Sequence, residues 1–145
     1  MATTAAIEDE VLAAITALVD GDGNQLFNQV DSIGRKDTPP PMSFPAAFVY
    51  FLFARKIEGG PRPTYDLFFD VVIMTQNLEG EQAAARDSYA LNEAVRDAIQ
   101  GKDFGLAGVG PFECLDIRLG DLEGGAIAYT LGFRTKAYLA VPSRS

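Results

Sequence analysis

The fold is decided by residues 64–100, which read TYDLFFDVVIMTQ (64–76), NLEG (77–80) and EQAAARDSYALNEAVRDAIQ (81–100). The first segment is apolar at every second position, as in a strand with one buried face. This face consists of Tyr65, Leu67, Phe69, Val71 and Ile73. The last segment repeats apolar residues every four positions and is followed by Gly101, which predicts an amphipathic helix. A strand followed by a helix that lies back across it predicts a two-layer domain.

The opposite face of strand 64–76 is half polar. It carries Asp66, Phe68, Asp70, Val72 and Met74. The two aspartates are four positions apart, so they share this face and could act as paired carboxylates. Because no set of basic or aromatic partners marks a cleft around them, we interpret them as solvated or interface acids.

One further helix and four further strands are expected from the same periodicities. They are helix 5–19 and strands 26–33, 46–53, 112–119 and 126–141. The element order is then α-β-β-β-α-β-β, which predicts an α+β domain with a mixed or antiparallel five-stranded sheet and two helices. We expect all 145 residues to form a single domain, 1–145.

Two of these elements carry more detailed expectations. In helix 5–19, the apolar stripe consists of Ile7, Val11, Ile15 and Leu18. Three acids in the first turn, Glu8, Asp9 and Glu10, interact favourably with the positive end of the helix dipole, and Gly21 and Gly23 end the helix. In strand 112–119, alternation places Leu115, Ile117 and Leu119 on one face and Cys114, Asp116 and Arg118 on the other.

Composition excludes several classes of function. The chain has 12 basic and 20 acidic residues, a net charge of −8, which argues against nonspecific binding to nucleic acid but permits a channel that DNA crosses without adhering. It has no histidine, so neither a Ser-His-Asp nor a Cys-His arrangement is possible. We find no catalytic motif and expect no enzymatic activity, cofactor or metal. The acidic turn 20–24 resembles the start of a calcium loop but lacks its sixth-position glycine and its final glutamate.

Cysteine content and the length of the apolar runs indicate the cellular compartment. The single cysteine, Cys114, cannot form an intrachain disulfide and is expected to be a packing residue. The longest apolar run, 46–54, is too short to span a bilayer, and no secretory signal precedes it. We therefore expect a soluble intracellular product with no membrane association.

Two connections are candidates for contact with other subunits. Residues 35–45 contain three consecutive prolines around Pro40, and form either a connection between strands or an arm that reaches a neighbouring subunit. Residues 54–63 are expected to be a turn with a basic cluster of Arg55, Lys56 and Arg62. This cluster is either solvated or paired with acids on a neighbour.

The sheet has more apolar surface than two helices can cover. Strand 46–53 is apolar on both faces, and eight of the 15 aromatic residues lie between Phe44 and Phe69. Burial of Phe68, Val72 and Met74 would contribute on the order of 5 kcal/mol, which favours assembly of identical copies as a dimer or a head-to-tail ring. The alternative is that the proline-rich loop or the glycine-rich connection 101–111 covers these side chains.

The order of elements resembles that of the tail-terminator proteins of tailed bacteriophages, in particular the phage Mu-like group with contractile tails. The similarity covers nearly the whole chain. It rests on a helix ending near Asp20, the Phe44-Pro45-Ala46-Ala47-Phe48 start of an apolar strand, the long strand 65–76, the 77–80 turn into an Ala-rich helix, and a closing hairpin that ends near Tyr138.

This resemblance implies a structural virion protein without enzymatic activity. Six copies would form a ring on the last tail-tube ring, stop tail polymerisation, and join the tail to the head-side neck or connector. The ring would also touch the last sheath ring, and DNA would pass through its lumen without specific binding. The protein would be assembled in the host cytoplasm and reside in the virion, with contact surfaces in loops 35–43 and 55–62.

The residues that we expect at subunit or partner interfaces combine the apolar patch with these loops. They are Phe68, Val72, Met74, Asp66, Asp70, Arg55, Lys56, Arg62, Pro40 and Phe44. Two alternatives stay open: another neck or tail-completion protein such as a stopper, or a small ligand-binding or enzymatic domain that uses Asp66, Asp70 or Asp116.

Overall fold

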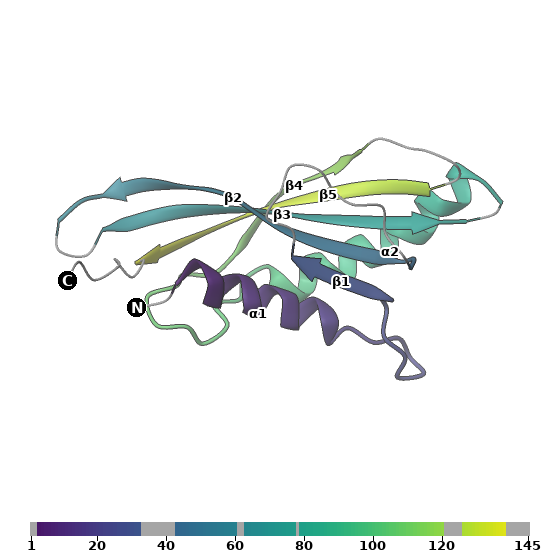
Figure 1. The fold of residues 1–145 in the computed structure, drawn as a ribbon, viewed down its shortest axis with the longest axis horizontal. Coiled ribbons are helices and arrows are strands. Elements are labelled where there is room, and N and C mark those ends of the chain that lie inside the picture. The colour runs from purple at the N-terminus through teal and green to yellow at the C-terminus, as the bar shows by residue number, and fades with distance from the viewer. Residues whose placement is uncertain (1–2, 33–42, 61–62, 78, 121–125, 139–145) are drawn as a thin grey trace.

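The computed structural model describes residues 3–32, 43–60, 63–77, 79–120 and 126–138 (Figure 1). It contains two helices and a five-stranded sheet in the expected order. The elements are α1 (Thr4–Thr16), β1 (Gln29–Ser32), β2 (Ala46–Glu58), β3 (Thr64–Gln76), α2 (Glu81–Ile99), β4 (Glu113–Leu119) and β5 (Ala126–Tyr138). The α+β fold class predicted from the sequence is confirmed.

The sheet is mixed and is centred on β3. Its strand order is β1-β2-β3-β5-β4, with β1 parallel to β2 and the other neighbours antiparallel. Strand β3 pairs with β5 along its whole length, from Thr64 opposite Tyr138 to Gln76 opposite Ala126. Strand β3, the first element of residues 64–100, is therefore the central strand of the sheet.

Both helices pack on one face of the sheet, which we call the inner face (Figure 1). The apolar side chains that the sequence predicts on this face of β3 lie in the core. Four of them are at most 1% exposed: Leu67, Phe69, Val71 and Ile73. The helices supply Ile7, Val11 and Ile15 from α1, and Val95 and Ile99 from α2. The period-two and period-four patterns thus meet in a single apolar layer.

Helix α1 is shorter than the sequence predicts. Thr3 caps it by accepting a hydrogen bond from the Ala6 amide to its Oγ1, at 3.1 Å, so the helix begins at Thr4 and its first turn contains no acid. It ends at Thr16, before Leu18 and both glycines. The chain then forms a tight turn in which Asp20 Oδ1 accepts the amides of Asp22 and Asn24. This turn competes with further helical hydrogen bonding.

Strand β2 is longer than predicted and is covered on both sides only at its start. Ala46 to Val49 are buried, whereas Phe51 to Phe53 are exposed. Backbone pairing with β3 continues past a bulge to Arg55, Lys56 and Glu58, for which the sequence pattern predicts a turn. The strand continues because pairing satisfies the backbone without requiring apolar side chains, and the glycines of the turn begin only at Gly59.

Strand β4 does not alternate simply. A register shift between Cys114 and Asp116 interrupts its pairing with β5. Cys114 therefore lies opposite Phe133 on the inner face and packs against the core, as expected for a packing residue, while Asp116 lies opposite Gly132 on the other face. The expectation that Cys114 and Asp116 share a face was wrong, because a bulge adds one residue to the strand. Strand β1 spans only Gln29–Ser32, a shorter range than the predicted 26–33, and its short length agrees with the weak alternation of this segment.

Candidate interaction surface

The face of the sheet turned away from the helices, here called the outer face, carries the side chains expected at an interface. On β3 these are Asp66, Phe68, Asp70, Val72 and Met74, as period two requires. Phe68, Val72 and Met74 are half-buried, and Asp66 is only 6% exposed. The apolar side chains on this face of β3 are therefore only partly covered by their own chain.

The largest apolar exposure lies on the second half of β2. It includes the end of strand 46–53, which the sequence analysis describes as apolar on both faces, and continues beyond it to Ile57. Residues 51–58 pair with residues 64–69 of β3 and extend past both helices at one end of the molecule (Figure 1); we call this segment the hairpin arm. Its large apolar side chains are exposed by 37–50%: Phe51, Leu52, Phe53 and Ile57. An apolar projection of this kind marks a contact surface more often than an isolated exposed residue does.

Phe68 belongs to a small stack on the outer face of this arm. Its ring lies 4.5 Å from that of Phe53 at an interplanar angle of 20°, and the Arg55 guanidinium carbon lies 5.6 Å from its centroid. Phe53 is 49% exposed, so the stack is open on one side. Stacked rings and a covering guanidinium hold these side chains in place before any partner arrives.

Asp66 is a buried acid beside this stack. Its Oδ2 lies 3.7 Å from Arg55 Nη2, whereas its Oδ1 is buried without a hydrogen-bond partner among the described residues. Asp66 and Asp70 do not form a pair of carboxylates. Each contacts a different arginine, and they lie four positions apart on an extended strand, a separation of about 13 Å.

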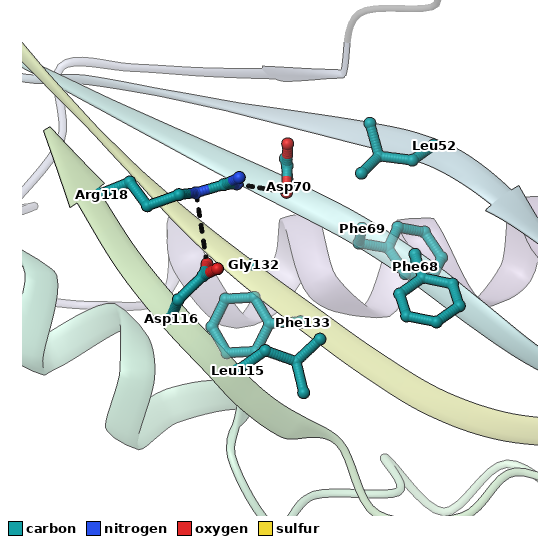
Figure 2. Close-up of a pocket in the computed structure, with 9 residues that line it drawn as sticks. All are labelled: Leu52, Phe68, Phe69, Asp70, Leu115, Asp116, Arg118, Gly132 and Phe133. Carbon is teal, nitrogen blue, oxygen red and sulfur yellow. Dashed lines mark hydrogen bonds and ion pairs between the residues drawn. The ribbon is translucent and has the colours of Figure 1, made fainter. Parts of the chain in front are cut away.

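A charged cluster lies on the outer face around Gly132 of β5. Arg118 Nη2 lies 3.2 Å from Asp70 Oδ1, and Arg118 Nε lies 3.3 Å from Asp116 Oδ1 (Figure 2). Gly132 stands opposite both acids, and a Cβ atom at this position would lie 2.7 Å from Asp116 Oδ1. The missing side chain therefore gives Asp116 and Arg118 the room to reach across β5.

The electrostatic state of Asp70 reflects its partial burial. Loss of solvent raises the pKa of its carboxyl above the ordinary value, the guanidinium of Arg118 opposes this shift, and the negative charge of Asp116 adds to it. The ion pair thus only partly offsets the cost of holding a carboxylate against an apolar wall.

That wall belongs to a shallow hollow of about 140 Å³, which we call the Gly132 hollow. Gly132 and the charged cluster border it on one side, and apolar side chains from three strands border the rest: Leu52 of β2, Phe68 of β3 and Leu115 of β4 (Figure 2). Leu115 is 45% exposed and Leu52 50% exposed, so the rim is open to a partner. The arrangement is suited to holding one apolar side chain beside a charged group.

The other predicted interface residues are distributed differently. Phe44 is half-buried just before β2. Arg55 and Lys56 lie on the arm itself and not in a loop. Pro40 and Arg62 lie outside the described residues, as does most of the 35–45 segment. In the described part of the chain no three side chains gather as a metal-binding group, and neither helix has the length and apolar character needed to cross a bilayer.

Sequence reasoning missed the residues that shape the hollow and the arm. Gly132 interrupts an otherwise regular strand pattern, which is a known sign of a close approach and could have been used. Ile57 follows the apolar run of β2 but stands among basic residues that favoured a turn. The contact between Arg118 and Asp70 joins residues 48 positions apart, and no local pattern indicates it.

No protein-family model matches this chain, and no curated protein matches it by sequence. Its fold is similar to that of a chain in a solved structure described as the virion of a native gene transfer agent particle. The two share 18% sequence identity with a TM-score of 0.55, over 74% of this chain and 77% of the other. At this identity the likeness concerns the fold alone.

Proposed function

We propose that this protein is a structural subunit of a phage-like particle, and specifically a tail terminator that forms a ring on the end of the tail tube. Such a ring stops tail polymerisation and presents a surface to the head-side neck. The observation that carries the proposal is the hairpin arm, whose exposed Phe51, Leu52, Phe53 and Ile57 call for a protein partner. The fold likeness to a chain of a virion suggests which kind of partner.

The energetics favour assembly. Covering the remaining exposed area of the four arm side chains would contribute roughly 1 kcal/mol each, and the half-buried Phe68, Val72 and Met74 would add to this. A closed ring repeats the same contact at every interface, so it contains one such contact for each copy. The net charge of −8 suits a lumen through which DNA moves without adhering.

Assembly is tested by the mass of the purified chain. We expect native mass spectrometry to show a closed oligomer, six copies for a tail terminator, and negative stain to show rings. Phe68→Asp should abolish the rings and leave the circular-dichroism spectrum nearly unchanged, because Phe68 is half-buried and lies outside the helix-packed core. Tyr89→Asp is the matched control, since Tyr89 is 52% exposed on α2 and should tolerate the change with rings intact.

The outcomes separate the hypotheses. A wild-type chain that stays monomeric at every concentration contradicts the proposal. If Phe68→Asp unfolds the chain, Phe68 is a core residue and the surface is misplaced. The terminator role itself is tested on tubes assembled from the tail-tube protein of the same particle. Added chain should halt their growth and appear as a ring on one end, whereas a stopper-like protein would leave tube length unchanged.

A further inference from the structure

The Gly132 hollow has the size of one apolar side chain. An apolar cavity of about 150 Å³ accommodates a molecule as large as benzene, and this hollow measures about 140 Å³. Gly132 borders it without a side chain, while Leu52, Phe68 and Leu115 supply apolar walls. Its charged rim of Asp70, Asp116 and Arg118 carries two negative charges and one positive, a formal net charge of −1.

The tip of the hairpin arm has the complementary properties. Ile57 is 44% exposed and is the last large apolar side chain of β2. Arg55, Lys56 and Glu58 around it carry two positive charges and one negative, in a chain whose total is −8. Because Arg55 pairs with Asp66 of β3, the positive charge offered to a neighbour is that of Lys56. A basic segment with a single apolar side chain matches an apolar hollow with an acidic rim.

The tip cannot occupy the hollow of its own chain. Leu52, which lines the hollow, and Ile57 lie on the same strand five residues apart, a distance of roughly 16 Å along an extended chain. Pairing of the arm with β3 from Phe53 to Glu58 prevents it from folding back. Contact between tip and hollow therefore requires a second copy of this chain.

We propose that the arm of each copy places Ile57 in the Gly132 hollow of the next copy, with Lys56 beside the Asp70 and Asp116 carboxylates. This contact rests on the self-assembly proposed above and identifies its geometry. When each copy contacts a different neighbour through its tip and its hollow, the contact is head-to-tail, and repeating it generates a ring or a filament. A reciprocal exchange of arms between two copies would close a two-fold dimer instead, and the cross-linking experiment below distinguishes the two arrangements.

The head-to-tail geometry allows a mixing experiment with two defective variants. Ile57→Asp disables the tip and keeps the hollow, whereas Leu115→Arg places a cation at the hollow and keeps the tip. Both positions are over 40% exposed, so both variants should fold, as circular dichroism will check. Each variant alone should be monomeric by native mass spectrometry. An equimolar mixture should form heterodimers and nothing larger, because one intact tip meets one intact hollow.

Contrary outcomes are clear in this experiment. If Ile57→Asp still forms wild-type rings, or if the mixture stays monomeric, the contact is wrong although the ring and the proposed function stand. If the wild-type chain forms no oligomer at all, the proposed function fails and the contact fails with it.

Cross-linking provides a second measurement that does not depend on disrupting the surface. Ile57→Cys and Leu115→Cys are combined in a Cys114→Ser background, and the assembled protein is oxidised. Head-to-tail contact should give a covalent ladder beyond the dimer, while either single cysteine variant should give at most a dimer. A double variant that stops at the dimer, or that does not cross-link, overturns the proposal.

Discussion

Strand β3 presents two apolar faces that differ in what covers them. On the inner face, Phe69 belongs to the apolar core to which both helices contribute, and it is 1% exposed. On the outer face its neighbour Phe68 stacks on Phe53, which is 49% exposed. Phe68 and Phe69 are the same residue type on the same strand, although the outer face also carries Asp66 and Asp70. The inner face therefore stabilises the domain, whereas the outer face and the hairpin arm leave apolar surface exposed, which we propose is covered by contact between subunits.

The largest effect expected from this difference is obtained with one substitution on each face. Phe69→Ala removes a fully buried ring and should lower the free energy of unfolding by about 3–5 kcal/mol, a large share of the stability of a domain of this size. Phe53→Ala removes a half-exposed ring and should cost less than about 1.5 kcal/mol. Urea unfolding at concentrations where the chain is monomeric measures both.

Equal losses from the two substitutions would contradict the distinction between the faces. The oligomeric state should respond in the opposite order. Phe53→Ala is expected to weaken ring formation at concentrations where Phe69→Ala, as far as it remains folded, still assembles. Light scattering on the same variants without urea, at concentrations where the wild-type chain is expected to assemble, checks this reversal.

A smaller effect is expected from a polar contact on the inner face. Thr75 Oγ1 and Ser88 Oγ lie 2.7 Å apart, and each lies within 3.0 Å of the Ala84 carbonyl oxygen, so they join the end of β3 to α2. Thr75→Val keeps the shape of the side chain and removes its hydroxyl group. Because Ser88 retains its bond to Ala84, we expect a loss of about 1 kcal/mol in the free energy of unfolding.

Thr130→Val is the matched control for this substitution. Thr130 lies opposite Val72 on the outer face and is half-buried. Its replacement should change the free energy of unfolding by less than about 0.5 kcal/mol. If the two valine variants lose the same stability, the contact between β3 and α2 contributes nothing specific.

The sequence predicts the inner face well and the outer face poorly, for a physical reason. Period two along β3 and period four along α2 arise because each element buries one side in the same core. That requirement is local and can be read without the structure. The length of β2 could not be read in this way, because its last residues are held by backbone pairing and carry Arg55 and Lys56, which are typical of a turn.

The hollow depends on information that a single sequence does not contain. Gly132 opens a space only because the register sets it opposite Asp70 on β3 and Asp116 on β4. The second of these alignments depends on a bulge near Leu115, which shifts every later residue of β4 to the other face. Neither the bulge nor the register follows from alternation, so Arg118 could not be placed beside Asp70 in advance.

The smallest effect expected concerns the charge of Asp70 on the outer face. Burial raises the pKa of its carboxyl above 3.8, so the folded chain holds this proton more tightly than the unfolded chain does. Its contribution to stability is fully present below pH 3.8 and is lost as the pH rises through the raised value. Asp70→Asn resembles the protonated side chain at every pH and removes this dependence.

The measurement is the thermal midpoint Tm of both proteins across the acidic range. As the pH falls from neutral through the raised pKa of Asp70, the Tm of the wild type should rise relative to that of Asp70→Asn. The rest of the sequence is the same in both proteins, so the difference between the two curves reports Asp70 together with the charges that it contacts. Parallel curves would show that Arg118 offsets the burial of Asp70 completely. The outer face would then hold its carboxylate at no cost, and the contrast with the inner face would rest on apolar coverage alone.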